Sequence, residues 1–151
     1  MMMRGYSLSG HVANMLRAAR AEATRLDCGY VSPELLLLGM MDEEGTLGAR
    51  VLTGLGMTRE VIAREMQTQI ARLPRYDAKV RGLLPYTSAA KRALEGAMDE
   101  ASELGDDYVD TGHLLLGILR DSESAAAKIL AVHDVTRERV RKELERLGPS
   151  S

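Results

Sequence analysis

The sequence predicts an all-α protein, an eight-helix bundle made of two related four-helix halves. Apolar residues recur at steps of three and four along most of the chain, which is the period of an α-helix. Leu, Ala, Val and Met carry much of the 45% hydrophobic content, and strand-favouring Phe and Trp are absent. The chain also repeats itself at a constant offset of 78 residues.

The repeat keeps its register over about fifty residues without a gap. A repeat of this length predicts two small helical units that pack about a pseudo-twofold axis. A half of about 65 residues would be marginal alone, so we expect one shared core and a single domain over residues 1–151. Repeat one should cover about 6–72, a linker about 73–85 and repeat two about 86–148. The clearest segment repeats Leu26, Tyr30, Val31, Leu36, Leu37, Leu38 and Gly39 as Leu104, Tyr108, Val109, Leu114, Leu115, Leu116 and Gly117.

The first helix of each copy shows an apolar stripe behind a capping hydroxyl. Ser9 is the expected cap of a helix whose stripe runs from Leu8 to Leu26, and Thr87 is the expected cap of its counterpart, whose stripe runs to Leu104. Small residues recur in both stripes, mainly alanine. We therefore expect each of these helices to approach a neighbour closely.

The second helix begins with several start signals and should be buried. Ser32 is a capping residue, Pro33 suits the first helical position, and Glu34 places an acid in the first turn of a helix over 34–41. Its counterpart starts at Asp110 and Thr111 and runs through 113–119. Both contain a Leu-Leu-Leu-Gly run that is apolar on all sides, which predicts a central position.

Two further helices complete each copy. The third helices should lie near 47–53 and 125–132, and Thr58 and Thr136 should cap the fourth helices, which end near residues 70 and 147. Between the copies, the proline-bounded linker with Gly82 inside it should lie over the surface as a strap. The tail over 148–151 should fray.

Composition limits the functional classes. A net charge of −2 with mixed signs offers no binding surface for a polyanion, and Tyr is the only aromatic residue, so we expect no nucleic-acid partner. Cys28 is the single cysteine, which excludes a disulfide scaffold. The three histidines lack metal-ligand spacing, so no metal and no cofactor is expected. Without a signal sequence or an apolar run of membrane length, we expect a cytoplasmic protein and no membrane partner.

The repeated strings resemble the Clp N-terminal domain, or Clp repeat, of the ClpA and ClpC class of AAA+ unfoldases. Residues 108–130 read YVDTGHLLLGILRDSESAAAKIL and residues 30–52 read YVSPELLLLGMMDEEGTLGARVL, while 84–105 open the second copy as LPYTSAAKRALEGAMDEASELG. The resemblance covers residues 6–148. It implies an eight-helix bundle of two Clp repeats that receives substrates and adaptors for an unfoldase.

The resemblance also implies a protein without catalysis of its own. The sequence has no G-x-x-x-x-G-K-S/T loop to hold a nucleotide. We therefore expect a non-catalytic module that recognises protein substrates, adaptors or peptide-like ligands of a Clp chaperone-protease system. One alternative is a stand-alone regulator or decoy that competes for adaptors or captures peptides aimed at the unfoldase. Another is a structural helical protein in which the repeat serves packing alone.

In ClpC-type relatives, a glutamate at the start of the second helix contributes to a pocket for phosphorylated arginine. On this resemblance Glu34 takes the glutamate's place and Ser9 that of a nearby hydroxyl, while in the second copy Thr87 keeps the hydroxyl and Gly112 replaces the glutamate. Pro33 replaces a threonine that the second copy keeps as Thr111. We therefore expect at most one complete pocket.

The expected recognition surface has two parts. One lies near the starts of the first two helices, at Ser9 and Glu34, and the other is an equivalent groove at Tyr86, Thr87 and Thr111. The plainer interpretation of Glu34 is an acid that interacts with its own helix terminus, worth about 0.3–1 kcal/mol.

Overall fold

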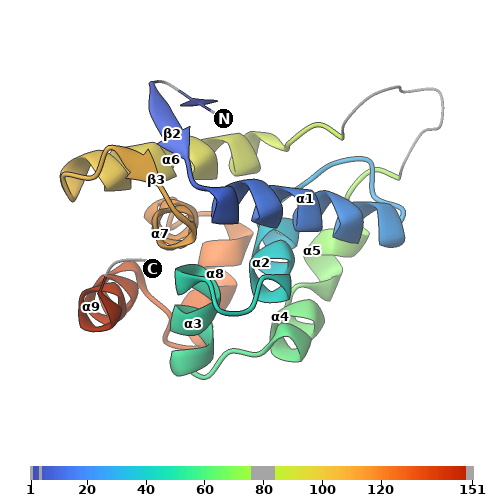
Figure 1. The fold of residues 1–151 in the computed structure, drawn as a ribbon. Helices are drawn as coiled ribbons and strands as arrows, with labels where there is room; N and C mark the ends of the chain where they lie inside the picture. Colours follow the sequence, from blue (N-terminus) through green and yellow to red (C-terminus); the bar gives the residue numbers. More distant parts are fainter. Residues whose placement is uncertain (1, 4, 76–83, 149–151) are drawn as a thin grey trace.

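The computed structural model describes residues 2–3, 5–75 and 84–148. Within these residues the chain forms nine helices and three short strands (Figure 1). In chain order they are β1 (Met2–Met3), β2 (Tyr6–Leu8), α1 (Gly10–Arg25), α2 (Pro33–Asp42), α3 (Leu47–Gly54), α4 (Arg59–Glu65), α5 (Gln67–Ala71), α6 (Ser88–Glu103), β3 (Tyr108–Val109), α7 (Thr111–Arg120), α8 (Ala125–Val132) and α9 (Arg137–Leu147).

The helices lie in layers around α2 and α7. In Figure 1 the two long helices, α1 and α6, form the upper layer, α2 and α7 lie beneath them, and α3, α4, α8 and α9 lie towards the bottom. The leucines of α2 from Leu35 to Leu38 are at most 1% exposed, and Leu114 and Leu116 of α7 are fully buried. The predicted central position of the Leu-Leu-Leu-Gly helices is therefore confirmed.

A glycine in each central helix allows the long helix above it to approach. A Cβ added at Gly39 of α2 would lie 2.7 Å from the backbone nitrogen of Ala19 and 2.7 Å from the carbonyl oxygen of Met15, both in α1. Gly117 of α7 meets the backbone of Ala93 and Ala97 in α6 in the same way. The close packing that the small residues predict is therefore present, and it also depends on these two glycines.

The helix starts follow the predicted capping residues. The hydroxyls of Ser9 and Thr87 accept hydrogen bonds at 3.1 Å from the backbone N–H groups of Val12 and Ala90. The side chains of Ser32, Thr58 and Thr136 cap α2, α4 and α9 by the same pattern. These caps satisfy amides that have no partner within their helices.

The two copies are joined by backbone pairing that crosses from one to the other. β2 runs parallel to β3, with Leu8 opposite Val109, and the N–H of Ser9 donates to the carbonyl of Val109 at 2.9 Å. The same pairing recurs 78 residues away, where Tyr86 lies opposite Val31 and the N–H of Thr87 donates to the carbonyl of Val31 at 2.9 Å. The start of each copy's first helix therefore lies beside the start of the other copy's second helix.

Two features differ from the expected plan. β1, β2 and β3 form a small sheet in the order β1-β2-β3, because the segments that lead into α1 and α7 must cross between copies. The fourth helix of the first copy is divided at Met66, where ψ is 6°, whereas α9 continues unbroken. Most of the expected strap and most of the expected fraying tail, over 76–83 and 149–151, lie outside the described residues.

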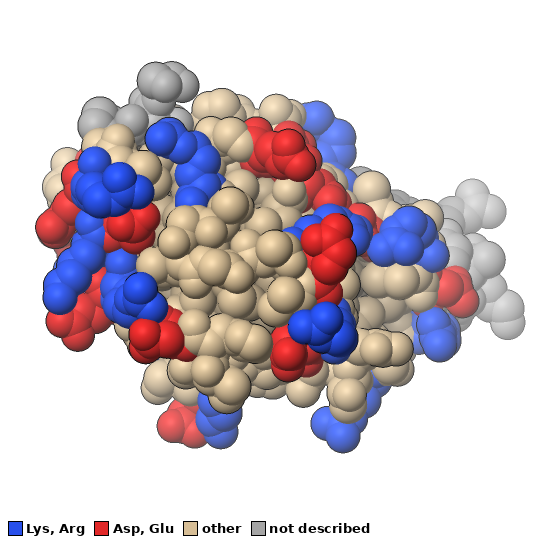
Figure 2. All heavy atoms as spheres, turned by 90° about the horizontal axis from the view of Figure 1, so that it is seen from below, with Lys and Arg blue, Asp and Glu red and all other residues tan. Residues whose placement is uncertain are grey.

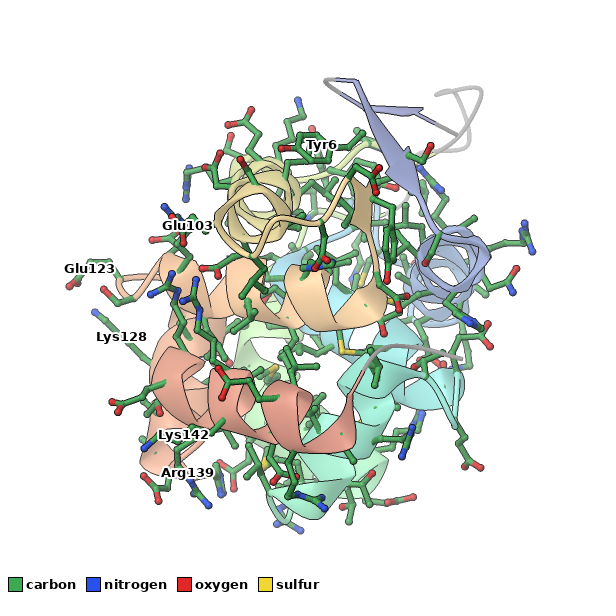
Figure 3. All side chains as sticks on the ribbon, turned by 60° about the vertical axis from the view of Figure 1, so that its left-hand side comes forward. Tyr6, Glu103, Glu123, Lys128, Arg139 and Lys142 are labelled. Atoms are coloured by element: carbon green, nitrogen blue, oxygen red, sulfur yellow. The ribbon has the colours of Figure 1, made fainter. Side chains whose placement is uncertain are left out.

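The surface carries charges of both signs. Seen from below, acidic and basic side chains lie beside one another around a central area without charge (Figure 2). On α8 and α9 the cations of Lys128, Arg139 and Lys142 point outwards (Figure 3). Each of them has an acidic neighbour, as for Arg139 and Asp134 at 2.8 Å. In the part of the chain that the structure describes, no helix combines the length and the apolar character needed to cross a membrane.

Candidate functional site

A pocket of about 320 Å³ lies where three helix amino termini meet. Glu34 in the first turn of α2, Ala89 in the first turn of α6 and Ala125 in the first turn of α8 all line it. We call it the Glu34 pocket. Its lining consists of Ser32, Pro33, Glu34, Gln69, Leu73, Thr87, Ala89, Arg92, Ser124, Ala125 and Ala126.

The three helix starts give the pocket donor groups and a positive electrostatic potential. Thr87 and Ser124 cap the amides of Ala90 and Ala127, each at 3.1 Å. The earlier amides of α6 and α8, including those of Ala89 and Ala125, have no partner within their own helices. Amino termini of helices attract anions because such N–H groups and the helix dipoles point towards them.

The same pocket also holds acceptor groups for a cation. Glu34 is only 6% exposed, and its carboxylate has no hydrogen-bond or ion-pair partner among the described residues. The Oε1 atom of Gln69 is also buried without a partner in that part of the chain. Buried polar atoms are normally hydrogen-bonded, so the oxygen of Gln69 indicates a place for a donor, and the Glu34 carboxylate beside it offers a second acceptor.

Arg92 adds an exposed cation to the rim. Its guanidinium pairs with Asp121 at 3.2 Å, and its side chain is 59% exposed. An exposed ion pair of this kind contributes little to stability, so Arg92 can turn towards an anion at small cost. The Glu34 pocket thus combines a carboxylate and an amide oxygen with a cation and several free N–H groups, which suits a ligand that carries both charges.

The predicted site residues are grouped differently from the sequence-based expectation. Glu34 shares its pocket with Thr87 of the other copy. Ser9, which the sequence groups with Glu34, instead donates from its hydroxyl to Oδ1 of Asp110 at 2.8 Å. The crossed backbone pairing explains this exchange, since it brings α6 to the start of α2 and α1 to the start of α7.

Tyr86 and Thr111 have structural contacts in this arrangement. The hydroxyl of Tyr86 accepts a hydrogen bond from Arg20 at 2.7 Å, and the guanidinium lies 4.9 Å from the centre of the ring. Burial raises the pKa of Tyr86, against the opposing effect of Arg20. Thr111 is fully buried, and its hydroxyl accepts from the N–H of Gly48 at 2.9 Å. Because Thr111 is buried, the structure does not support the expectation that it lines a binding groove.

The position equivalent to the Glu34 pocket in the second half lacks the glutamate. Gly112 stands where Glu34 would be, and a Cβ added there would lie 2.7 Å from Cδ2 of Leu144 in α9. The side chain of Thr111 occupies the start of α3, which corresponds to α8. Asp110 replaces Ser32, so a carboxylate lies where an anion would approach. The expectation of at most one complete pocket stays a prediction.

Sequence reasoning missed Gln69, Arg92 and Ser124. Ser124 carried a signal, because it directly precedes an alanine run and so has the position of a helix cap. Gln69 and Arg92 carried none, because only the tertiary fold brings α5 and α6 to the start of α2.

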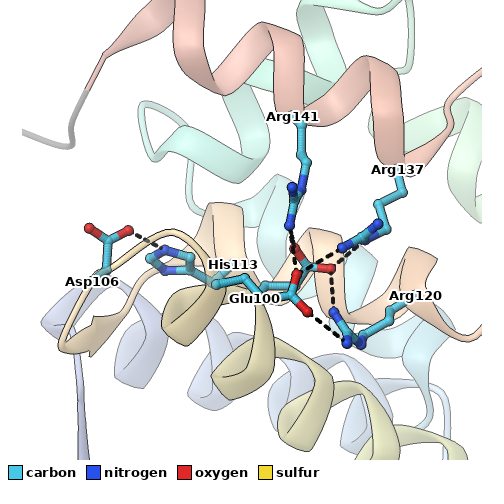
Figure 4. A network of polar contacts seen from close by, with 7 residues as sticks. Glu100, Asp106, His113, Arg120, Arg137 and Arg141 are labelled. Carbon is cyan, nitrogen blue, oxygen red and sulfur yellow. Dashed lines mark hydrogen bonds and ion pairs between the residues drawn. The ribbon is translucent and has the colours of Figure 1, made fainter.

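Two other polar features fit structural roles. Glu100 is fully buried and is bound by Arg120, Arg137 and Arg141 (Figure 4). Burial opposes ionisation, but the hydrogen bonds from the three arginines hold the pKa of Glu100 below its ordinary value. Cys28 is buried, and that burial raises the pKa of its thiol, contrary to what a nucleophile needs. Within residues 2–3, 5–75 and 84–148, no group of three or more metal-binding side chains occurs.

Comparison with known proteins gives a family and several relatives. The chain matches the family described as "Clp repeat (R) N-terminal domain" over residues 7–133. It is 34% identical over 128 residues to the ATP-dependent Clp protease ATP-binding subunit ClpC of Staphylococcus epidermidis, which is 85% of this chain and 15% of that protein. It is 37% identical over 116 residues to the negative regulator of genetic competence ClpC/MecB of Bacillus subtilis, covering 77% and 14%. The chain therefore spans about one seventh of the length of these relatives.

Solved structures of low sequence identity share the fold. The N-terminal domain of ClpD from Arabidopsis thaliana superimposes with a TM-score of 0.70 at 21% identity, covering 96% of this chain and 97% of that one. The N-domain of ClpV from Vibrio cholerae gives a TM-score of 0.74 at 16% identity, covering 93% and 84%. A ClpV N-domain in complex with a VipB peptide gives 0.66 at 17% identity, covering 91% and 84%.

Proposed function

The chain belongs to the Clp repeat N-terminal domain family, and we propose that it is a recognition module that binds protein substrates, adaptors or peptide-like ligands for an ATP-driven Clp unfoldase. Its family relatives are ATP-binding subunits of the Clp protease, and a ClpV N-domain of the same fold binds a VipB peptide. The module itself performs no chemistry in this proposal. It acts only by binding some polypeptides more tightly than others.

The observation that carries the proposal is the paired charge of the Glu34 pocket. A phosphorylated arginine has a guanidinium group and a phosphate group on the same side chain. The carboxylate of Glu34 and Oε1 of Gln69 provide acceptors for the guanidinium, and the amino termini of α6 and α8 provide donors for the phosphate. Thr87 supplies the hydroxyl that the resemblance places at such a site. We therefore propose phosphoarginine, within a protein or free, as the ligand of this pocket.

A calorimetric titration with free phosphoarginine tests this ligand. We expect saturable binding to the wild-type chain, and Glu34→Gln should weaken it roughly tenfold or more, because a hydrogen bond between charged groups is lost. Glu60→Gln is the matched control, since Glu60 is also an acid in the first turn of a helix but is exposed and lies outside this pocket. Both variants should melt close to the wild type. Absence of binding by the wild type, or equal binding by Glu34→Gln, would contradict the assignment.

The loss of the glutamate in the second copy, where Gly112 stands, favours a second candidate function. A module with one pocket binds its ligand once, and a free copy of it would act as a regulator or decoy that competes for adaptors or sequesters marked peptides. Adding the purified chain to a degradation assay with a ClpC-type unfoldase tests this role. A decoy lowers the degradation rate as its concentration rises, and Glu34→Gln should be less effective.

A further inference from the structure

A second pocket, of about 270 Å³, lies between α9, the start of α7 and the loop that precedes β3. We call it the Asp106 pocket. Its apolar wall includes Leu47, Leu104 and Leu144. Its polar lining consists of Asp106, Tyr108, Asp110, His113, Arg141 and Glu145. It shares no lining residue with the Glu34 pocket, but Leu47, Asp110 and Gly112 of its lining stand at the positions that Ala125, Ser32 and Glu34 take there.

The internal repeat shows what the corresponding place holds in the first copy. Leu26 and Cys28 correspond to Leu104 and Asp106, and both line a pocket of the first half that Arg75 also lines. The guanidinium of Arg75 donates to the carbonyl of Leu26 at 3.1 Å. It is also close enough to the Cys28 thiol to lower its pKa in part. In the first copy an arginine side chain therefore occupies this position.

In the second copy the same position is more acidic. Asp106 stands in place of Cys28 and Glu145 in place of Gln67, which adds two carboxylates, while Arg141 in place of Ala63 adds one cation. The side chain of Asp106 is 39% exposed, so its charge is accessible. Such a pocket would hold a cation more strongly than the first copy holds Arg75.

The neighbouring groups leave that negative charge unbalanced. The Nδ1 atom of His113 accepts from the N–H of Asp110 at 2.9 Å, so the neutral ring carries its proton on Nε2, which donates to Asp106 at 2.8 Å (Figure 4). Arg141 is the basic side chain of the lining; its Nη2 atom is bound to Glu100 and Glu103, and its Nε atom is buried without a partner among the described residues.

Asp110 provides an independent sign of a missing donor. This residue is only 2% exposed and lines the pocket. Its Oδ1 atom accepts from Ser9 and from the N–H of Thr111, but its Oδ2 atom is buried without a partner among the described residues. A buried carboxylate oxygen without a donor is costly, and a cationic ligand would remove that cost.

We propose that the Asp106 pocket binds an unmodified arginine side chain of a partner polypeptide, in the position that Arg75 occupies in the first copy. The aliphatic part of the side chain lies against Leu104 and Leu144, and the guanidinium donates to the carbonyl of Leu104 and to Asp106. The partner's backbone stays farther out than in the first copy. A Cβ at Gly29 would lie 2.8 Å from the carbonyl oxygen of Arg75, and Asp107 carries a Cβ at the matching position.

A titration with two blocked tripeptides tests the proposal. Acetyl-Leu-Arg-Leu-amide should bind saturably to the full chain and shift the backbone amide resonances of residues 104–108. The same peptide with citrulline keeps the shape but lacks the charge, and we expect it to bind roughly tenfold more weakly. Equal binding of the two peptides, or shifts confined to another face, would overturn the proposal.

Substitutions in the lining test whether the arginine peptide binds in the Asp106 pocket. Asp106→Asn keeps an oxygen that can accept from His113, yet it should weaken the arginine peptide roughly tenfold, and Glu145→Gln on the opposite wall should weaken it in the same direction. Asp27→Asn is the matched control, because Asp27 is an exposed acid of the corresponding loop in the first copy. Glu34→Gln should leave this binding unchanged, which separates it from the phosphoarginine site. Unaltered affinity in both Asp106→Asn and Glu145→Gln would overturn the proposal.

Discussion

Arg59 donates a hydrogen bond to the carboxylate of Glu22 at 2.6 Å, and the same pairing recurs 78 residues later between Arg137 and Glu100. In both copies the glutamate lies on the first long helix and the arginine opens the fourth. The surroundings differ. Glu22 and Asp42 share Arg59, whereas the position of Asp42 is taken by Arg120 in the second copy.

Removing the buried charge should therefore cost more in the second copy. Glu100→Gln would leave three arginines facing Glu103 alone, and we expect the free energy of unfolding to fall by about 3 kcal/mol, as when one partner of a buried pair is removed. Glu22→Gln should cost less, because Asp42 still faces Arg59. Urea denaturation measures both, with the exposed Glu138→Gln as control. A larger loss for Glu22→Gln would contradict this account.

The same carboxylates predict sensitivity to acid. Burial opposes their ionisation, but hydrogen bonds from arginines keep the pKa of Glu22 and Glu100 below the ordinary value in the folded protein. Their contribution is therefore complete above the unfolded pKa of about 4.3 and is lost as the pH falls through the lower folded pKa. The urea midpoint should drop steeply below about pH 4. Glu100→Gln should flatten that part of the profile, and an unchanged slope would refute the link.

Gly39 should not tolerate a side chain. A Cβ there meets the backbone of α1, which cannot turn aside as a side chain could. We expect Gly39→Ala to lower the free energy of unfolding by about 1–3 kcal/mol through overpacking. Gly10→Ala is the matched control, because nothing lies within 4 Å of its added Cβ. Thermal melting compares the two, and a Gly39→Ala variant as stable as the wild type would show that α1 and α2 can separate without cost.

Restoring the family glutamate at position 112 should not by itself create a second phosphoarginine pocket. In Gly112→Glu the new side chain collides with Leu144, and Asp110 still repels the phosphate. Combining Gly112→Glu with Leu144→Ala and Asp110→Ser removes both obstacles and copies the first-copy arrangement. Calorimetry should show one ligand per chain for the single variant and two for the triple variant. A second site in the single variant would mean that α9 moves aside readily.

Much of the fold follows from local sequence patterns. Ser9, Ser32, Thr58, Thr87 and Thr136 cap helices where they were expected to, because a cap depends on the next three residues only. The leucine runs were expected to be buried because they are apolar on every side. The short parallel strands were not predictable, since a segment such as Tyr6–Leu8 is too short to show a period and pairs with residues about a hundred positions away.

The candidate site was predicted in its parts but not in its grouping. The chemistry of Glu34 and Thr87 follows from the resemblance, whereas the exchange of partners between copies is a property of tertiary structure. Ser9 therefore lies beside Asp110 rather than beside Glu34. The approach of Leu144 to Gly112 also depends on how α9 packs, which no pattern along α9 reveals.

The crossed pairing has a consequence for how such a chain could have arisen. A lone copy would expose the edges at Leu8 and Val31 with nothing to pair against them, and two lone copies meeting face to face would satisfy both edges at once. Joining two such copies in a single chain keeps both edges paired and leaves each half free to diverge. The contrast between Glu34 and Gly112 is the kind of asymmetry that identical subunits could never have shown.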